Sequence, residues 1–301
     1  MKIGSCFYKG RAYLCVPDKN STISVPALDP QCPDHFSTVI NFLNTGDFSL
    51  ESLRDFIKAS GDKIKIADSF ELLAPIPRPL QNIMCLGLNY ADHIEETSAI
   101  MGRDAKIPEH IIVFTKAANS VNAPYGDIPY DPGVSTKIDW ESELGVIIGK
   151  PGKQIKAEDA YDHVFGYTVI NDISARDLQR RHKQFFLAKS LEGSCPMGPF
   201  IVTADEIKNP HDLEIQCRVN GKVKQKSNTK FQIFDIPTQI ETISKGMNLE
   251  PGDIIATGTP SGVGFARTPP EYLIPGDIVE CEVEKIGIIR NKITHIVNEK
   301  I

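Results

Sequence analysis

The sequence predicts a mixed α+β fold in which a large β-rich domain, with a rolled or barrel-like sheet, follows a small α+β N-terminal domain. Strand-like apolar runs recur after residue 80 and are mostly separated by Gly and Pro turns, whereas helical patterns are few. Three prolines fall within the five residues 75–79, where the chain cannot continue a helix. Strands and helices do not alternate regularly, so a Rossmann fold is disfavoured.

We place the domain boundary after residue 75, which gives a small N-terminal domain at 1–75 and a larger domain at 76–301. Residues 1–16 predict a β-hairpin with its turn at Lys9-Gly10. Two short helices follow at helical spacing of apolar residues, one behind Asp34 and one behind Ser49, because Asp and Ser are common N-cap residues.

In the larger domain the expected strands are the apolar runs 83–86, 111–114, 144–148, 164–170, 200–202, 213–219, 254–256 and 278–283. The expected helices are roughly 91–102, 157–162, 174–188 and 236–247.

Composition narrows the classes of protein to consider. The chain has 301 residues, is 41% apolar and carries a formal net charge of −6 without a basic cluster, which argues against nucleic-acid binding. No apolar run reaches the roughly 20 residues of a membrane helix, and the start lacks the apolar core of a signal peptide. The seven cysteines are scattered without a Cys-x-x-Cys pair, which favours reduced thiols in a cytoplasmic protein over a zinc site.

Two glutamates lie at the start of a predicted buried strand. Glu141 and Glu143 are two residues apart, so on a strand they point to the same face beside the run 144–148. Two carboxylates on one face repel each other unless a cation lies between them, and Mg²⁺, Mn²⁺ and Ca²⁺ prefer oxygen ligands. The alternative is an edge strand with a charged solvent face.

Asp172 supplies a third carboxylate directly after the predicted strand 164–170. At a strand end its side chain can reach a pocket, although it would equally suit the cap of the following helix. With Glu141 and Glu143 it would form a site with a charge of about −3, which needs a cation to be stable. Three protein ligands leave positions open for water and substrate oxygens, as in a catalytic metal site.

His93 and Glu96 share a face if a helix begins near Ala91. A carboxylate bonded to one imidazole nitrogen makes the other nitrogen a better base, so the pair would deprotonate a water near a metal. The alternative is a surface helix with a weak His–Glu contact. The polar segment 101–108, which contains a Gly and a Pro, suits a mobile lid.

Two further segments contain candidate residues. Lys189 ends an apolar helix before a Gly/Pro-rich turn, where it would pair with the metal ligands or an oxyanion, or else form a solvated helix end. The glycine-rich turn 256–264 follows a strand, and its N–H groups and hydroxyls would cradle an anion such as a carboxylate. It lacks the Gly-Lys-Ser/Thr of a nucleotide-binding loop.

In their order along the chain, these segments resemble the fumarylacetoacetate hydrolase family from about Pro79 to Asn291. The set of motifs is specific although each is weak alone: Gly87-x-Asn89-Tyr90-x-x-His93-x-x-Glu96, Phe114-x-Lys116, Asp139-x-Glu141-x-Glu143-Leu144, Asn171-Asp172-x-Ser174-Ala175-Arg176-Asp177-x-Gln179, Lys189-Ser190, Cys195-Pro196-x-Gly198-Pro199 and Thr257-Gly258-Thr259-Pro260-x-Gly262-Val263-Gly264. Leu88, Ala117 and Glu192 depart from the family's pattern and bear on pocket shape.

The resemblance implies the family's β-rich rolled catalytic domain, usually in a homodimer. It implies Mg²⁺ or Mn²⁺, with Ca²⁺ as a substitute, at three ligands: Glu141, Glu143 and Asp172. It also implies a catalytic set in which a dyad lies on a lid that orders with ligand and a lysine steadies developing negative charge: His93, Glu96 and Lys189. The substrate contacts that it implies are Asn89, Tyr90, Lys116, Arg176, Gln179, Gly258 and Thr259.

The predicted function is metal-dependent cleavage of a C–C bond in a 2-oxo or 2,4-dioxo acid through a metal-bound enolate. This is the fumarylacetoacetate or acylpyruvate hydrolase type of reaction, with oxaloacetate decarboxylation as a related activity; neither nucleic acid nor a membrane is an expected partner. The alternatives are isomerisation of hydroxymuconate-type acids (5-carboxymethyl-2-hydroxymuconate or 2-oxohept-3-enedioate) and dehydration or cleavage of sugar acids. A non-catalytic metal-binding scaffold is disfavoured, because the ligands and the dyad are all present.

Overall fold

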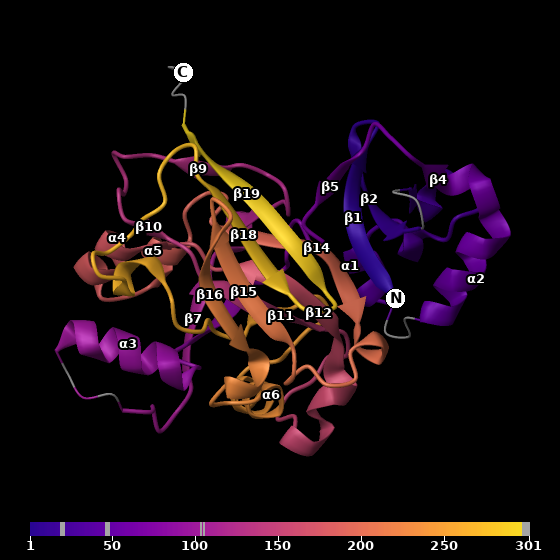
Figure 1. Ribbon diagram of the computed structural model, residues 1–301. Helices are drawn as coiled ribbons and strands as arrows, with labels where there is room; N and C mark the ends of the chain where they lie inside the picture. The colour runs from indigo at the N-terminus through magenta and orange to yellow at the C-terminus, as the bar shows by residue number, and fades with distance from the viewer. Residues whose placement is uncertain (19–21, 46–48, 103, 105, 297–301) are drawn as a thin grey trace.

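The computed structural model describes residues 1–18, 22–45, 49–102, 104 and 106–296. Over these ranges the chain has the predicted mixed α+β architecture, with large sheets of mixed strand direction and few helices (Figure 1). Every strand that the sequence predicted is present, mostly with small differences at the ends. The largest difference is at the strand predicted for 200–202, which begins at Cys195, within the segment expected to be a Gly/Pro-rich turn. The sheets are open at their edges, so the described strands form a rolled arrangement without closing a barrel.

The N-terminal segment contains β1 (Lys2–Tyr8), β2 (Arg11–Pro17), β3 (Ile23–Ser24), α1 (Val39–Leu43), α2 (Leu50–Ser60), β4 (Lys65–Ile66) and β5 (Glu71–Leu73). The predicted hairpin is β1–β2. Helix α2 begins as predicted behind Ser49, whose Oγ accepts a 3.0 Å hydrogen bond from the N–H of Ser52. The expectation for Asp34 was wrong, because residues 34–36 form a separate 3-10 turn and Thr38 caps α1.

The rest of the chain contains β6 (Ile83–Gly87), α3 (Ala91–Met101), β7 (Ile112–Lys116), β8 (Val121–Asn122), β9 (Ile128–Tyr130), β10 (Ile138–Asp139), β11 (Ser142–Ile148), β12 (Val164–Asn171), β13 (Ser174–Ala175), α4 (Arg176–His182), α5 (Phe186–Lys189), β14 (Cys195–Thr203), β15 (Glu214–Val219), β16 (Lys222–Asn228), α6 (Ile236–Ser244), β17 (Ile254–Ala256), β18 (Ile278–Val283) and β19 (Gly287–His295).

Two expected helices differ from the prediction. The segment 157–162 is part of a 3-10 helix, Ala157–His163. The expected helix 174–188 is divided into α4 and α5, because Lys183 adopts a left-handed backbone with a φ angle of 59° and ends α4. The segment 101–108 that suits a lid includes residues 103 and 105, which lie outside the described residues.

The main sheet has twelve strands, ten of them in the order β4-β3-β2-β1-β14-β12-β11-β17-β6-β7. Strand β1 pairs with β14, which joins the N-terminal segment to the rest of the sheet; a domain boundary near residue 75 stays a prediction. A second sheet has the order β16-β15-β18-β19-β9. Strands β11 and β12 pack against this second sheet and are buried along their whole length, so their ends are fixed positions on which a site can be built.

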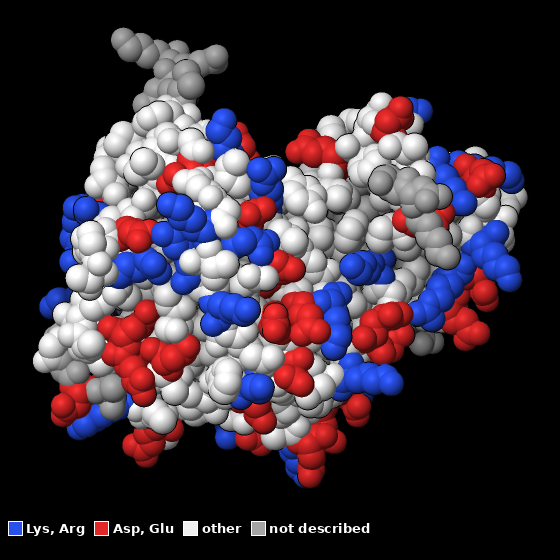
Figure 2. All heavy atoms as spheres, viewed as in Figure 1, with Lys and Arg blue, Asp and Glu red and all other residues white. Residues whose placement is uncertain are grey.

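Basic and acidic side chains are interspersed on the face of the molecule shown in Figure 2. This mixed pattern agrees with the absence of a basic cluster in the sequence. In the described part of the chain, no helix has the length and apolar character needed to span a bilayer.

Candidate active site

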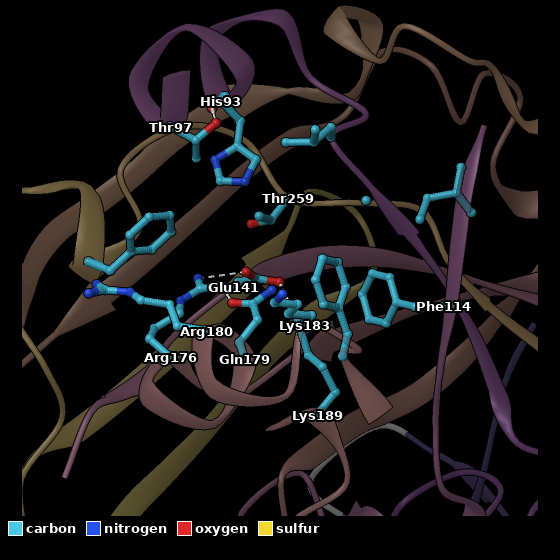
Figure 3. A pocket seen from close by; sticks show the side chains of 15 residues that line it. His93, Thr97, Phe114, Glu141, Arg176, Gln179, Arg180, Lys183, Lys189 and Thr259 are labelled. Atoms are coloured by element: carbon cyan, nitrogen blue, oxygen red, sulfur yellow. Dashed lines mark hydrogen bonds and ion pairs between the residues drawn. The ribbon is translucent and has the colours of Figure 1, made fainter. Parts of the chain in front are cut away.

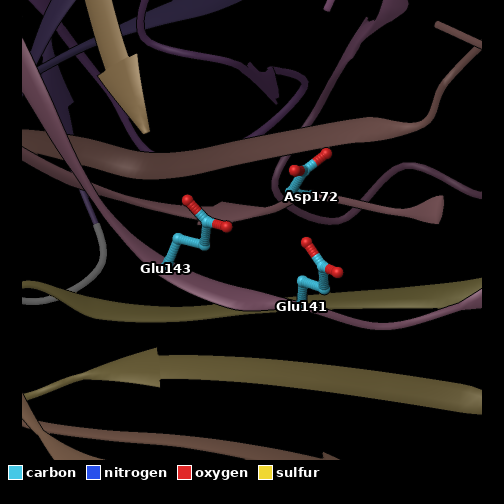
Figure 4. Close-up of side chains that lie close together, drawn as sticks. All are labelled: Glu141, Glu143 and Asp172. Carbon is cyan, nitrogen blue, oxygen red and sulfur yellow. The ribbon is translucent and has the colours of Figure 1, made fainter. Parts of the chain in front are cut away.

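Three carboxylates meet at one end of the β11–β12 pair. The antiparallel register places Ser142 opposite Asn171, so Glu141 and Asp172, the next residues outward, lie side by side. The N–H of Asp172 donates a 2.8 Å hydrogen bond to the carbonyl of Glu141. Together with Glu143 they form a triad in which one oxygen from each side chain lies within 4.8 Å of the others (Figure 4).

The triad is almost fully buried, with exposed fractions of 0% for Asp172 and 1% for Glu143. Burial and the charges of Asp172 and Glu141 raise the pKa of Glu143 well above its ordinary value. Burial also acts to raise the pKa of Glu141, but the charges of Lys189 and Arg176 outweigh it and hold that pKa below its ordinary value. Of these two glutamates, Glu143 is therefore the one whose charged form is destabilised by its surroundings.

Two buried lysines neutralise part of the triad. Lys189 at the end of α5 points inward as predicted, and its Nζ lies 2.6 Å from both Glu141 Oε2 and Asp172 Oδ2. Lys116 Nζ lies 2.8 Å from Asp172 Oδ1 and donates a hydrogen bond to the carbonyl of Ile173. Within the described chain, neither lysine forms an ion pair with Glu143.

Arg176 is held in one orientation by three side chains. Its Nε lies 2.8 Å from Asp139 Oδ2 and its Nη2 lies 2.6 Å from Glu141 Oε1. Its Nη1 donates a 3.1 Å hydrogen bond to Gln179, and its guanidinium carbon lies 4.4 Å from the centre of the Phe265 ring. Sequence reasoning gave Asp139 no role, yet this buried carboxylate orients an arginine of the site.

The triad fits a hard divalent cation. All of its donors are oxygens, which Mg²⁺ and Mn²⁺ prefer. Asp172 Oδ1 is buried without a hydrogen bond in the described protein, because the contact with Lys116 lacks hydrogen-bond geometry. A cation among the three carboxylates would also relieve the repulsion that raises the pKa of Glu143. Glu141, Glu143 and Asp172 are therefore the residues that would hold such an ion.

The predicted pair on α3 is formed. His93 Nδ1 lies 2.8 Å from Glu96 Oε1, since residues three apart share a helix face. This interaction occupies Nδ1, so Nε2 is the ring nitrogen that a ligand in the cavity can meet. The second oxygen of Glu96 accepts a 2.9 Å hydrogen bond from the N–H of Gly262, and Ser261 Oγ donates to Asp92. These contacts fix the dyad to the glycine-rich turn.

The glycine-rich turn binds carboxylates of the protein itself. Its N–H groups donate three such hydrogen bonds: Gly258 to Glu143 at 2.8 Å, Gly262 to Glu96 at 2.9 Å and Gly264 to Asp139 at 2.6 Å. The sequence predicted that this turn cradles an anion such as a carboxylate, and the carboxylates that it binds are side chains of the protein. Substrate contacts by Gly258 and Thr259 stay a prediction. Thr259 is the residue of the turn that lines the cavity.

A cavity of about 480 Å³ adjoins the triad. The predicted site residues that line it are His93, Glu141, Arg176, Gln179, Lys189 and Thr259. In the view of Figure 3, His93 lies on one side of this space and Arg176 and Gln179 lie on the other, with Glu141 between them. The candidate base therefore faces the cavity together with part of the candidate metal site.

Other predicted residues lie behind the cavity wall: Glu143, Asp172, Asn89, Tyr90, Lys116 and Gly258. The side-chain amide of Asn89 hydrogen-bonds to the backbone of Phe234 and Thr257, so it joins two loops. Tyr90 is fully buried, and its hydroxyl lies 3.5 Å from Gln232 Nε2. Direct substrate contacts by Asn89 and Tyr90 stay a prediction, and the observed contacts are with the protein.

Sequence reasoning missed two basic cavity residues, Arg180 on α4 and Lys183 at the end of that helix. A helical signal was present for Arg180, because it follows Arg176 and Gln179 at a spacing that keeps the three on one face. The left-handed backbone of Lys183 takes it off the helical pattern. The apolar part of the lining was not predicted either and consists of Leu86, Leu88, Phe114, Phe185 and Phe265. Leu88 and Phe114 had appeared only as positions within motifs.

The sequence of the chain is similar to a known protein family and to individual members of it. The family profile described as Fumarylacetoacetate (FAA) hydrolase C-terminal matches residues 82–294. The chain is 53% identical over 224 residues to the oxaloacetate tautomerase YisK of Bacillus subtilis (strain 168), which covers 74% of this chain and 73% of that protein. It is 43% identical over 275 residues to the mitochondrial oxaloacetate tautomerase FAHD2A of Bos taurus, and the match spans 90% of this chain and 83% of that protein.

Solved structures with the same fold carry different names. A fumarylacetoacetate hydrolase from the psychrophilic Exiguobacterium antarcticum is similar with a TM-score of 0.81 and 36% identity, covering 98% of this chain and 99% of that one. A 5-carboxymethyl-2-hydroxymuconate delta-isomerase from Mycobacterium smegmatis is similar with a TM-score of 0.73 and 29% identity, and the match spans 98% of this chain and 99% of that one. The fold alone therefore does not select the reaction.

Proposed function

Because the chain belongs to the fumarylacetoacetate hydrolase family of enzymes, we propose that it interconverts the enol and keto forms of oxaloacetate with the help of a divalent cation. The observation that carries the proposal is the His93–Glu96 pair, whose imidazole lines the same cavity as Glu141 and Lys189. A positioned base beside a cation site is what proton transfer next to a carbonyl requires. The similarity to two oxaloacetate tautomerases supports this choice of substrate.

Glu141, Glu143 and Asp172 would hold Mg²⁺ or Mn²⁺. When bound, the cation supplies Lewis-acid polarisation of the oxygens of a 2-oxo acid. Lys189 adds a positive charge at the same end of the cavity. Burial acts to lower the pKa of Lys189, but the charges of Asp172 and Glu141 outweigh it and raise that pKa, so the amine stays protonated at neutral pH.

The proton transfer is assigned to the imidazole. When the enol becomes the keto form, carbon C3 of oxaloacetate gains a proton and the hydroxyl on C2 releases one to water. His93 Nε2 delivers the proton to C3 and then regains a proton from water, which closes the cycle; in the reverse direction it takes the proton from C3 and releases it to water. Glu96 holds Nδ1, which fixes the tautomer of the ring and stabilises its positive charge. Lys189 steadies the negative charge on the C2 oxygen while the hydroxyl proton leaves.

Cleavage of a C–C bond is the second candidate, either hydrolysis of an acylpyruvate or decarboxylation of oxaloacetate. The same imidazole favours hydrolysis, because an imidazole bonded to Glu96 is suited to take a proton from a water that attacks the distal carbonyl. Decarboxylation requires no attacking water. The candidates share the cation site and differ in the role of His93, which moves a proton of the substrate in tautomerisation, takes a proton from water in hydrolysis and has no water to activate in decarboxylation.

The test is a parallel assay of the purified protein with Mg²⁺ or Mn²⁺ and with EDTA. Loss of the enol absorbance of freshly dissolved oxaloacetate reports tautomerisation, pyruvate formation reports decarboxylation, and loss of the diketone absorbance of acetylpyruvate reports hydrolysis. We expect EDTA-sensitive tautomerisation to be the fastest of the three. Enol decay no faster than in buffer would reject the proposal, and dominant hydrolysis or decarboxylation would establish the second candidate.

A further inference from the structure

One face of α4 places several polar side chains along the cavity. Arg176, Gln179 and Arg180 recur at positions i, i+3 and i+4, so they lie on one side of the helix. Lys183, the left-handed residue that ends the helix, lines the cavity together with them. Figure 3 shows this group on the side of the cavity away from His93. Ligands that reach this wall therefore meet mostly positive charge.

The three basic residues of this group, Arg176, Arg180 and Lys183, differ in how far carboxylates of the protein neutralise their charge. Arg176 is buried and lies within ion-pair distance of both Asp139 and Glu141. Within the described chain, no carboxylate lies within the 4.0 Å of an ion pair from Arg180 or Lys183. Both side chains are largely exposed, so water solvates them until a ligand enters. These two charges are available to an anionic group.

The charge balance of the site favours a dianionic ligand. The buried groups around the triad are four carboxylates and three cations: Asp139, Glu141, Glu143 and Asp172, with Lys116, Arg176 and Lys189. These seven groups carry a net charge of −1 when all are ionised. A divalent cation would change this to +1, and Arg180 and Lys183 would raise the total to +3. A dianion takes up most of that positive charge, whereas a monoanion leaves most of it uncompensated.

The lining also separates two ends of a ligand. The 2-oxo acid end would lie at the triad and Lys189, and much of the remaining wall is apolar, with Phe114, Phe185 and Leu88. We propose that Arg180 and Lys183 bind the distal carboxylate of the substrate and thereby select dianionic 2-oxo acids over monoanionic ones. A guanidinium matches a carboxylate with paired N–H groups, and an ammonium adds a point charge. This inference rests on the proposed function, which sets the orientation of the 2-oxo acid.

The test compares R180Q, K183Q and the double variant with R181Q. Arg181 is an exposed neighbour on the same helix that does not line the cavity, so R181Q is the matched control. The substrates are oxaloacetate and its C4 monomethyl ester, which keeps the carbon skeleton but removes the distal charge. Each single variant should raise the KM for oxaloacetate by about threefold to tenfold, as expected for partly exposed ion pairs, and leave kcat nearly unchanged. The KM for the ester should not change.

Salt and direct binding give independent readouts. Added salt should raise the wild-type KM for oxaloacetate more than that of the double variant, because salt screens exposed charges. Calorimetry with Mn²⁺-loaded protein should show that the wild type binds oxaloacetate more tightly than the ester, and that the double variant loses this preference. Matched thermal unfolding midpoints would show that the variants are folded.

The outcomes separate the two proposals. Equal effects of the variants on both substrates, or a double variant that still prefers the dianion, would overturn the role of Arg180 and Lys183 while leaving tautomerisation intact. Absence of tautomerisation would overturn the proposed function, and the calorimetric preference for the dianion would still decide the role of these residues. A wild type that binds neither compound would overturn the inference.

Discussion

The backbone N–H of Gly258 donates a 2.8 Å hydrogen bond to Oε2 of Glu143, which joins the glycine-rich turn to the buried triad. Gly258 has a φ angle of +97°, and a Cβ atom at this position would lie 2.8 Å from the Cβ of Asn89. The positive φ angle and the close packing both require glycine here. Glu143, whose pKa is raised by burial and by the charges of Asp172 and Glu141, thus depends on a backbone position that tolerates no side chain.

Replacement of this glycine should disturb the candidate metal site. We expect G258A to lower the free energy of unfolding by about 1–3 kcal/mol, since alanine is strained at this φ angle. Relief of the strain and of the contact with Asn89 should shift the backbone, move the N–H of residue 258 away from Glu143 and so weaken Mn²⁺ binding. Denaturant unfolding and calorimetric titration measure the two effects. G246A is the control, because a Cβ at Gly246 meets nothing within 4 Å. Wild-type metal affinity in a folded G258A would contradict the role of this hydrogen bond.

Metal addition should stabilise the protein through the triad. A cation that binds only the folded state stabilises it by about 2.7 kcal/mol at roughly one hundred times its Kd, so Mg²⁺ or Mn²⁺ should raise the unfolding midpoint of the metal-free protein. E143Q keeps the shape of the side chain but removes its charge, and the metal-dependent rise should disappear. E158Q, at an exposed glutamate, should keep it. A midpoint of the wild type that does not respond to either metal would count against the site.

Loss of the imidazole should affect turnover and spare metal binding. We expect H93N to lower kcat by about 10²–10⁴-fold, the usual contribution of a general acid or base, and E96Q to lower it less, because the ring remains in place. Calorimetry should show unchanged Mn²⁺ affinity in both variants. E95Q, at an exposed neighbour on α3, is the control. Near-normal turnover by H93N would remove His93 from the mechanism.

Asp139 should be a positioning residue with a large effect on stability. Its carboxylate accepts hydrogen bonds from the N–H groups of Gly264 and Phe265 and pairs with buried Arg176. Removal of one partner of a buried ion pair costs about 3–5 kcal/mol, so D139N should lower the free energy of unfolding by this amount in urea. D127N, at an exposed aspartate, should change it little. A loss below about 1 kcal/mol would show that Arg176 does not depend on Asp139.

Apolar patterning was sufficient to predict most of the sheet. The runs in β11 and β12 are continuous because both strands are buried, which is the pattern that single-sequence reasoning detects best. Strands β16 and β19 were missed. Strand β16 is an edge strand of polar sequence with an irregular register, and β19 alternates buried and exposed residues in place of a continuous apolar run. The break between α4 and α5 was missed because Lys183 adopts a left-handed conformation, which is uncommon for lysine and so cannot be predicted from its residue type.

The site could be predicted where its contacts are local. His93 and Glu96 lie within one helical turn, and Glu141 and Glu143 lie on one strand, so spacing alone suggested both groups. The carboxylates that the turn binds could not be predicted because they are distant in sequence: Gly258 and Glu143 are 115 residues apart, and Gly262 and Glu96 are 166 apart. Such contacts follow from the packing of the fold, which no local pattern encodes.

The helix α4 begins only four positions after Asp172 and ends at the left-handed Lys183. On its cavity face Arg176 is paired with Asp139 and Glu141, whereas Arg180 and the following Lys183 are exposed and form no ion pair within the described chain. If Arg180 and Lys183 bind the distal carboxylate as proposed, substitutions at these two positions would give a lineage a new substrate while the residues around His93 and Glu141 stay the same. By the same reasoning, positions 180 and 183 are the ones to exchange between relatives when a designer wishes to transfer the substrate preference of one to another.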